Sequence, residues 1–141
     1  MFHTHTGEHI DVVYRRDASY DPEALAQLDH FLRDHRDGTV KHYDPRLFDL
    51  LNSLVAKVRP QAEINIICGY RTPHSNGWLR RRSSAVARNS LHMAAEAIDI
   101  RVPGVKLAHL RDVALAFRRG GVGYYAAENF VHVDVGRVRR W

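Results

Sequence analysis

The two stretches that decide the fold are AIDI at residues 97–100 and FVHVDV at residues 130–135. Successive side chains of a β-strand point to opposite faces of a sheet. If both stretches are strands, their isoleucines and valines face a core, while Asp99, His132 and Asp134 lie on the opposite, polar faces. On neighbouring strands these two polar faces would form one site.

Three further segments are predicted to be strands. VGYY at residues 122–125 is separated from FVHVDV by a short loop at 127–129, which predicts a β-hairpin. INIIC at 64–68 is typical of a buried strand and leads into the turn-like GYRTP at 69–73. Residues 9–14 place apolar side chains at every second position, which predicts a fifth strand.

Two helices begin with the same signal, an aspartate followed by a proline. Asp21-Pro22 and Asp44-Pro45 each place a capping carboxylate before a proline at the first helical position. Apolar residues follow at three-to-four spacing, which predicts core-facing helices over 21–32 and 44–55. Pro60 is expected to end the second helix.

The remaining chain adds two helices and sets the fold class. Residues 107–118 predict an amphipathic helix that ends at Gly120-Gly121. Polar, arginine-rich residues 74–88 predict a short helix and then a mobile surface loop with the small residues at 83–85. Early helices and late strands predict an α+β fold, a small antiparallel sheet packed against amphipathic helices, in one domain over residues 1–141.

Composition narrows the class of protein. A chain of 141 residues that is 45% hydrophobic and 26% charged can bury one core. No apolar run approaches the roughly 18 residues of a membrane span. The net charge of +5 comes mainly from arginines and suits an anionic polymer or a carboxylate ligand. Zinc-finger cysteine pairs, RNA-binding aromatic motifs and basic helices leading into heptads are missing, so nucleic acid is not expected as a partner.

Cys68 is the only cysteine and lies in an apolar run. We therefore expect a buried structural thiol rather than a nucleophile, and no internal disulfide. The opening MFHTHTGE has neither a positive region nor an apolar core of the kind found in secretory signals. Either the protein is cytoplasmic, or an export segment is absent from this sequence.

His92, Asp99 and His132 are the residues best suited to hold a metal ion. His92 and Asp99 are seven positions apart, and in one helix they would be about 10 Å apart, too far for bonds of about 2 Å to one metal. A turn must therefore separate them. Two imidazoles, a carboxylate and an open fourth position form a catalytic zinc pattern, in which the metal acidifies water and polarises a carbonyl. On spacing alone, the alternative is that none of the three binds metal. His92 would then be a surface or capping histidine, Asp99 a charge at the end of a strand, and His132 a hydrogen-bonded histidine.

A family resemblance favours the metal site. SLH at residues 90–92, then Ala97, Asp99 and a histidine on a terminal strand resemble the signature of the LAS metallopeptidases, the group named for lysostaphin, D-alanyl-D-alanine peptidases and sonic hedgehog. Further matches run in order along the whole chain: HTGE (5–8), GYR (69–71), SAVA (84–87), GGVGYY (120–125), NFVHVD (129–134), RVR (137–139) and Trp141. Together they are similar to the murein endopeptidase branch of this group, and ordered matches of this kind are highly specific.

The resemblance implies a hedgehog-like or D-alanyl-D-alanine peptidase-like fold whose sheet carries the metal site. It implies one zinc ion, Zn2+, held by His92, Asp99 and His132. It further implies a zinc metallopeptidase that hydrolyses peptide cross-links of peptidoglycan, in the nearest branch those between two diaminopimelate residues. Peptidoglycan stem peptides are the expected partners, and the periplasm or cell envelope is the expected location. The sequence leaves open D,D or L,D specificity and the oligomeric state.

Two residues match substrate-contacting positions of the group. Arg71 matches the arginine after Gly-Tyr that engages substrate in D-alanyl-D-alanine peptidases, and its planar guanidinium suits a carboxylate or a peptide carbonyl. A structural ion pair is the alternative. Ser90 matches the serine two before the first ligand, where it would hydrogen-bond substrate or cap a helix.

The chain departs from the group at two positions. Ala95 stands where the pattern usually has glycine, which questions the geometry of that turn because glycine often marks a positive φ. Asn129 stands where D-alanyl-D-alanine dipeptidases carry a catalytic carboxylate. The general base is therefore open: Asp134 is the first candidate because it shares a face with His132, and Glu128 in the adjoining loop is the second. Orienting His132 is the alternative role of Asp134.

These departures leave room for a second class of function. A non-catalytic peptidoglycan-binding or signalling module would keep the zinc only as a structural ion. An open position on the metal, with a carboxylate in reach, would favour the enzyme.

Overall fold

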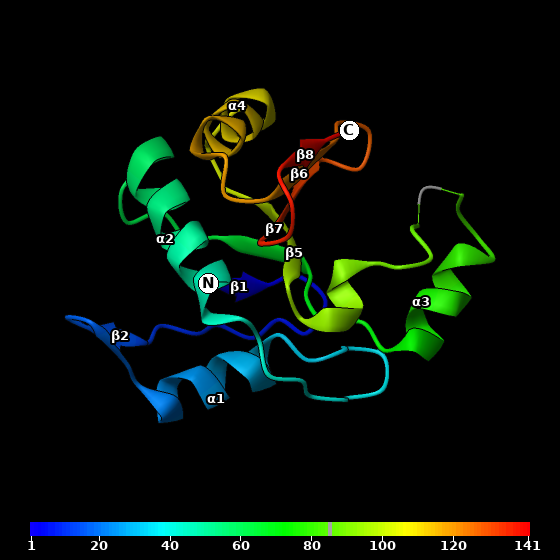
Figure 1. The fold of residues 1–141 in the computed structure, drawn as a ribbon, viewed down its shortest axis with the longest axis horizontal. Coiled ribbons are helices and arrows are strands. Elements are labelled where there is room, and N and C mark those ends of the chain that lie inside the picture. Colours follow the sequence, from blue (N-terminus) through cyan, green and yellow to red (C-terminus); the bar gives the residue numbers. More distant parts are fainter. Residues whose placement is uncertain (85) are drawn as a thin grey trace.

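The first two helices of this chain precede most of its strands. The computed structural model describes residues 1–84 and 86–141. The helices are α1 (Pro22–Phe31), α2 (Pro45–Val58), α3 (Pro73–Arg80), the 3₁₀-helix η1 (Leu91–Ala94) and α4 (Leu107–Phe117). The strands are β1 (Phe2–His3), β2 (Arg15–Arg16), β3 (Ser19–Tyr20), β4 (Asn65–Cys68), β5 (Ala97–Arg101), β6 (Gly121–Tyr125), β7 (Phe130–Asp134) and β8 (Arg139–Arg140). The predicted α+β class is confirmed (Figure 1).

The main sheet has six strands in the order β1-β4-β5-β7-β6-β8, and β2 pairs with β3 separately. The central strands are antiparallel, as predicted, but each edge strand pairs in parallel with its neighbour. The sheet is therefore mixed. The difference arises because α1 and α2 intervene between β1 and β4, and β7 between β6 and β8, so neither pair is joined by a hairpin.

The two faces of the central strands separate core from site. Isoleucines of β5 pair with valines of β7, as in Ile98 with Val133, and all of them are fully buried. Asp99 is directly opposite His132 across the same ladder. The polar faces predicted for these strands therefore do meet. α2 and α4 pack together on the core side, whereas α3 lies away from them across the sheet (Figure 1).

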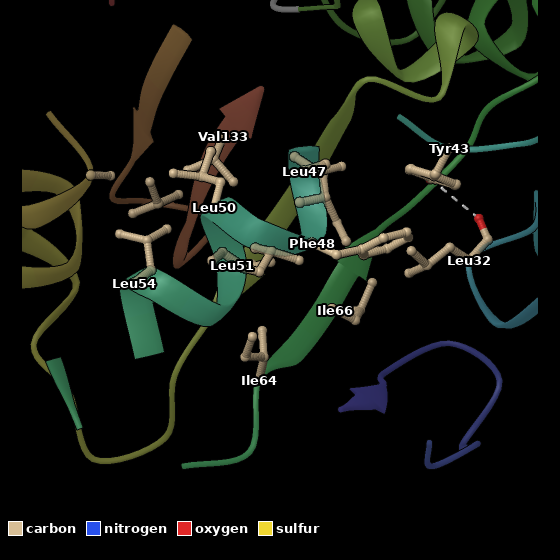
Figure 2. Close-up of a cluster of buried hydrophobic side chains, with 14 of the residues drawn as sticks. Leu32, Tyr43, Leu47, Phe48, Leu50, Leu51, Leu54, Ile64, Ile66 and Val133 are labelled. Carbon is tan, nitrogen blue, oxygen red and sulfur yellow. Dashed lines mark hydrogen bonds between the residues drawn. The ribbon is translucent and has the colours of Figure 1, made fainter. Parts of the chain in front are cut away.

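The core fills the space between α2 and the sheet. Five buried apolar side chains come from α2: Leu47, Phe48, Leu50, Leu51 and Leu54. They pack with Ile64, Ile66 and Val133 (Figure 2). Burying each such side chain stabilises the fold by roughly 1.5 to 3 kcal/mol. This packing gives the site a rigid support.

The Asp-Pro signals begin helices as predicted. The Asp21 carboxylate accepts hydrogen bonds from the backbone N–H of Glu23 at 3.0 Å and of Ala24 at 3.2 Å. Asp44 accepts one from Arg46 at 2.9 Å, and a proline follows each cap. Both helices are therefore closed at the N-terminal end by their own sequence.

The strand predicted at residues 9–14 is wrong. Only His9 forms a β-bridge there, with Phe2. Ile10, Val12 and Tyr14 pack against the core without pairing in a strand, whereas Val13 is exposed. Alternation in this segment therefore reflects burial of one side and not pairing.

The predicted end of α4 at two glycines is also wrong. The helix ends at Phe117, and Arg118 takes the left-handed conformation with φ 51°. Gly121 already belongs to β6. A Cβ on Gly120 would lie 1.7 Å from the carbonyl oxygen of Asp134, so this glycine allows a close backbone approach.

The short helix predicted after residue 73 is confirmed as α3, which ends at Arg80. Of the small residues at 83–85, Ala85 lies outside the described residues. Within the described parts of the chain, no helix is both long enough and apolar enough to cross a membrane.

Candidate active site

A turn holds His92, as its spacing from Asp99 required. The Ser90 Oγ accepts a hydrogen bond from the His92 backbone N–H at 3.4 Å and caps η1. Ala95 ends this short helix in the left-handed conformation, with φ 57° and ψ 38°. The position does need a positive φ, and alanine supplies it in place of glycine at a cost of roughly 1 to 2 kcal/mol. The reversal brings His92 back toward Asp99.

Three electron-pair donors converge at one point. His92 Nε2 lies 3.1 Å from His132 Nδ1 and 3.2 Å from Asp99 Oδ1. His132 Nδ1 lies 2.9 Å from the same Asp99 oxygen. All three residues are buried. The structure thus brings together the three residues that the sequence proposed as metal ligands.

A hydrogen bond to the outer ring nitrogen of each histidine fixes the orientation of the ring, and so which nitrogen faces the other two candidate ligands. His92 Nδ1 lies 2.8 Å from the carbonyl oxygen of Gly69, and His132 Nε2 lies 3.0 Å from Asp134 Oδ2. Both partners only accept, so these outer nitrogens carry the hydrogens. With both rings neutral, the inner nitrogens and the Asp99 carboxylate present lone pairs to one another. Burial would lower the pKa of His132, but its hydrogen bonds with Asp134 and Asp99 outweigh burial and raise that pKa, so positive charge is favoured at this centre. A cation at the centre would satisfy all three.

The donor set fits a divalent metal ion. Ligands bound at 2.0 to 2.1 Å in a tetrahedron are about 3.3 to 3.4 Å apart, and the three separations here lie between 2.9 and 3.2 Å. Cys68 pairs with Asp99 between β4 and β5. Its Sγ and ligand atoms of His92 and Asp99 all lie within 4.8 Å of one another.

Burial and the neighbouring side chains together set the pKa values of His92, Asp99 and Cys68. Burial lowers the pKa of His92, which keeps the imidazole neutral. Burial alone would raise the pKa of Asp99, but the adjacent His92 and His132 outweigh it and hold that pKa below its usual value. Burial also raises the pKa of the Cys68 thiol to about 12. Cys68 is thus the buried thiol that the sequence predicted.

Asp134 is fully engaged in holding His132. Its carboxylate also accepts from the backbone N–H of Gly121 at 2.8 Å and of Gly136 at 2.9 Å. The Arg139 guanidinium donates to both oxygens, at 3.0 and 2.7 Å. Burial would raise the pKa of Asp134, but the bonds from His132 and Arg139 outweigh it and lower that pKa. The geometry disfavours Asp134 as the general base and favours its alternative role, orienting His132.

A cavity of about 660 Å³ opens onto the three ligand residues. By sheet order, its lining residues divide between two sides of the β5–β7 pair. His5 and Arg71 follow the strands on one side, whereas Tyr125 and Trp141 come from the other. The cavity has the size of a small-molecule or peptide site.

Glu128 lines this cavity from the β6–β7 turn. It is exposed, and its carboxylate forms no hydrogen bond or ion pair with any other residue that the structure describes. The neighbouring Asn129 has φ 58° in the same turn, a conformation that asparagine adopts more readily than most residues. The free carboxylate of this turn is therefore that of Glu128.

Arg71 lies buried at the edge of the cavity. Its Nη2 donates to Ser90 Oγ at 3.1 Å, while its Nε is buried without a partner. Among the described residues no carboxylate lies within 4.0 Å of it, so the structural ion pair is not found. Ser90 caps η1, one of the two roles considered for it, and also holds this guanidinium. Its contact with substrate stays a prediction.

Sequence reasoning missed what Arg139 and Trp141 do. Arg139 holds Asp134, and the ring centroid of Trp141 lies 5.1 Å from that of His132. Trp141 Nε1 donates to the Tyr125 hydroxyl at 2.8 Å. Arg139 and Trp141 are two positions apart, so in an extended segment both side chains lie on the same face. That alternation and the match of both residues to the family pattern were the signals available in the sequence.

The fold and the site, with a mixed sheet presenting two histidines and an aspartate to an open cavity, are typical of metal-dependent hydrolases. Residues 1–141 match the M15 peptidase family described as peptidoglycan L,D-endopeptidase MepK. The chain belongs to this family, which confirms its resemblance to the murein endopeptidases.

Individual relatives agree with the family match. Over 137 residues the chain is 42% identical to the peptidoglycan L,D-endopeptidase MepK of Escherichia coli K12, covering 97% of this chain and 75% of that protein. It is 41% identical over 137 residues to the probable peptidoglycan L,D-endopeptidase MepK of Haemophilus influenzae, covering 96% and 74%. No solved structure matches significantly.

Proposed function

We propose that this protein is a zinc-dependent peptidoglycan endopeptidase that cleaves the bond between two diaminopimelate residues. The observation that carries the proposal is the convergence of His92 Nε2, Asp99 Oδ1 and His132 Nδ1 beneath an open cavity. Three protein ligands leave one tetrahedral position free, as in catalytic zinc sites. The relatives are named L,D-endopeptidases, which supports the choice of bond.

Each residue of the site has a separate task in this proposal. Zinc held by the three ligands would polarise the scissile carbonyl and acidify a water molecule. Glu128 would take a proton from the attacking water and pass it to the leaving amine as the amide C–N bond breaks. Asp134 holds the His132 ring so that Nδ1 faces the centre.

Substrate binding follows from charge. Within the described residues the Nε of Arg71 has no partner at the cavity edge, and this side chain would bind a carboxylate or carbonyl of a stem peptide. The net charge of +5 suits the same anionic polymer. We further propose that the protein acts in the periplasm or cell envelope, where this substrate lies.

Two measurements on the purified protein test the proposal. We expect one equivalent of zinc by elemental analysis, and release from purified sacculi of products cut between two diaminopimelate residues, with loss of both in His132→Ala. Products cut only at D-alanyl-diaminopimelate links would contradict the proposed bond. If the zinc-loaded protein leaves purified sacculi undigested, the proposed enzymatic activity is contradicted.

Cys68 gives the non-catalytic module its only specific support. If its Sγ, which lies within 4.8 Å of the His92 and Asp99 ligand atoms, were a fourth ligand, the zinc site would be closed and structural. In an enzyme the fourth zinc position stays open to water, and Cys68 only packs in the interior. We therefore expect Cys68→Ser to keep zinc affinity and the rate of hydrolysis within about three-fold of wild type. Loss of zinc from this variant, with sacculi left intact by the wild type, would favour the module.

A further inference from the structure

The cavity continues past the metal ligands to a cationic end. His5, Arg36 and Arg71 line it there. Arg71 was expected at this place, but Arg36 follows α1 by a few residues and carries no motif that points to a site. Its presence adds a second guanidinium beside that of Arg71, whereas the third arginine of the cavity, Arg139, donates to both oxygens of Asp134.

Arg36 is held through its backbone and by a long ion pair with Asp34, and within the described residues its guanidinium donates no hydrogen bond. Asp34, which is completely buried, accepts from the Arg36 backbone N–H at 3.1 Å. Its other oxygen accepts from the backbone N–H of Thr72 at 2.9 Å and from the Thr72 hydroxyl at 3.1 Å. The Arg36 Nη1 is 3.7 Å from Asp34, beyond hydrogen-bond distance. The loop is fixed, while the side chain, 28% exposed, keeps its donors available.

Arg71 has an unused donor as well. In the part of the chain that the structure describes, its Nε is buried without a partner, while its Nη2 donates to Ser90. Arg71, Arg36 and Cys68 line the same cavity, so both positive charges face the cavity that the strand carrying Cys68 also lines.

We propose that Arg36 and Arg71 together form a clamp for one carboxylate, that of the diaminopimelate residue whose amine is released. The proposal rests on the proposed function and specifies its substrate. With the scissile carbonyl over the metal ligands, the adjacent carboxylate would reach the cationic end. Two planar guanidinium groups can hold both oxygens of a carboxylate, whereas a primary amide offers one acceptor and no charge.

The test compares two cross-linked peptides that differ only in this group, a free carboxylate in one and a primary amide in the other. We expect wild type to prefer the carboxylate peptide, and Arg36→Gln to lower kcat/KM on it by roughly ten- to a hundred-fold, the effect of losing charge-assisted hydrogen bonds. On the amide peptide the same variant should differ little from wild type. Arg36→Lys should recover part of the loss, and Arg88→Gln, a matched charge change at an exposed residue outside the cavity, should have no effect.

Binding of both peptides to the zinc-loaded protein and thermal melts are measured in parallel. An equal loss of activity on both peptides, or an unchanged preference in Arg36→Gln, would overturn the clamp. If wild type cleaves neither peptide, the proposed function fails. The clamp is then tested separately by comparing the affinities of the protein for the two peptides. Tighter binding of the carboxylate peptide that disappears in Arg36→Gln supports it, and equal binding of the two peptides overturns it.

Discussion

At the scale of single residues, the partner of each polar group decides its role. Alternation in FVHVDV correctly placed His132 and Asp134 on one face. It could not show that Arg139, from a later segment, occupies both Asp134 oxygens. The three candidate ligands could therefore be predicted from the sequence, whereas the base could not, because a strand pattern gives the direction of a side chain but not its partners. Metal binding itself stays a prediction.

Glu128→Gln tests the general base. The amide keeps the shape of the side chain but cannot accept the proton, so kcat should fall by roughly a hundred- to ten-thousand-fold. Zinc content and melting temperature should stay at wild-type values, because Glu128 is exposed and contacts no ligand. Steady-state kinetics with elemental analysis checks both. Wild-type kcat in this variant would assign the proton transfer to another group.

Asp134→Asn tests the orienting role. Asparagine at this position loses the charge that holds Arg139 and the outer nitrogen of His132. We expect zinc affinity to fall roughly ten- to a hundred-fold, the usual effect of removing a partner behind a ligand. Competition with a chelator measures this. Unchanged zinc affinity combined with lost turnover would instead make Asp134 the base.

At the scale of elements, strand β6 leaves a gap that Trp141 fills. Gly123 pairs with His132, and a Cβ on Gly123 would lie 2.7 to 2.8 Å from atoms of the indole ring. The missing side chain lets the ring lie against the sheet beside His132. A glycine in a strand of apolar residues therefore has a packing reason.

Gly123→Ala should displace the indole from His132. We expect altered tryptophan fluorescence and weaker zinc binding by a few-fold, with a loss of stability of roughly 1 to 3 kcal/mol from overpacking. Chemical denaturation and zinc titration measure these effects. Trp141→Ala supplies the comparison, since adding Gly123→Ala to it should cost much less. Equal costs in both backgrounds would rule out the contact as the cause.

The helices and central strands could be predicted because each carries a local signal, such as the Asp21 cap or the alternation around Asp99. The edge strands β1 and β8 have two residues each, too few to show any period. Their existence depends on the neighbour beside them. Residues 9–14 show the converse: their apolar residues alternate as in a strand, but apart from the single bridge of His9 to Phe2 they pair with no strand.

At the scale of the whole molecule, stability should fall in mild acid. Burial lowers the pKa of His3, and burial with the adjacent Arg36 lowers that of His35 to about 4. The unfolded histidines titrate near 6.5 and so take up protons first. Their contribution is complete above about pH 6.5 and is lost as the pH falls toward 4. We expect the melting temperature of the zinc-free protein to drop by several degrees over this range.

His35→Gln isolates that contribution. The variant cannot titrate, so its melting temperature should decline less steeply between pH 6.5 and 4 even if it is lower at every pH. The ring stack of His35 on His5, with centroids 4.2 Å apart, accounts for the constant loss. Parallel curves for the two proteins would show that His35 has the same pKa in the folded and the unfolded chain.

The pairing of β5 with β7 across α4 also sets when the site can exist during folding. Asp99 and His132 meet only after that non-local ladder closes, and such closures are slow because their entropy cost comes before their contacts. Before then, an ion would meet ten scattered histidines with no preferred set. Native zinc binding should therefore follow the transition state, so zinc would leave the refolding rate unchanged and slow the unfolding rate, making the loaded protein kinetically long-lived.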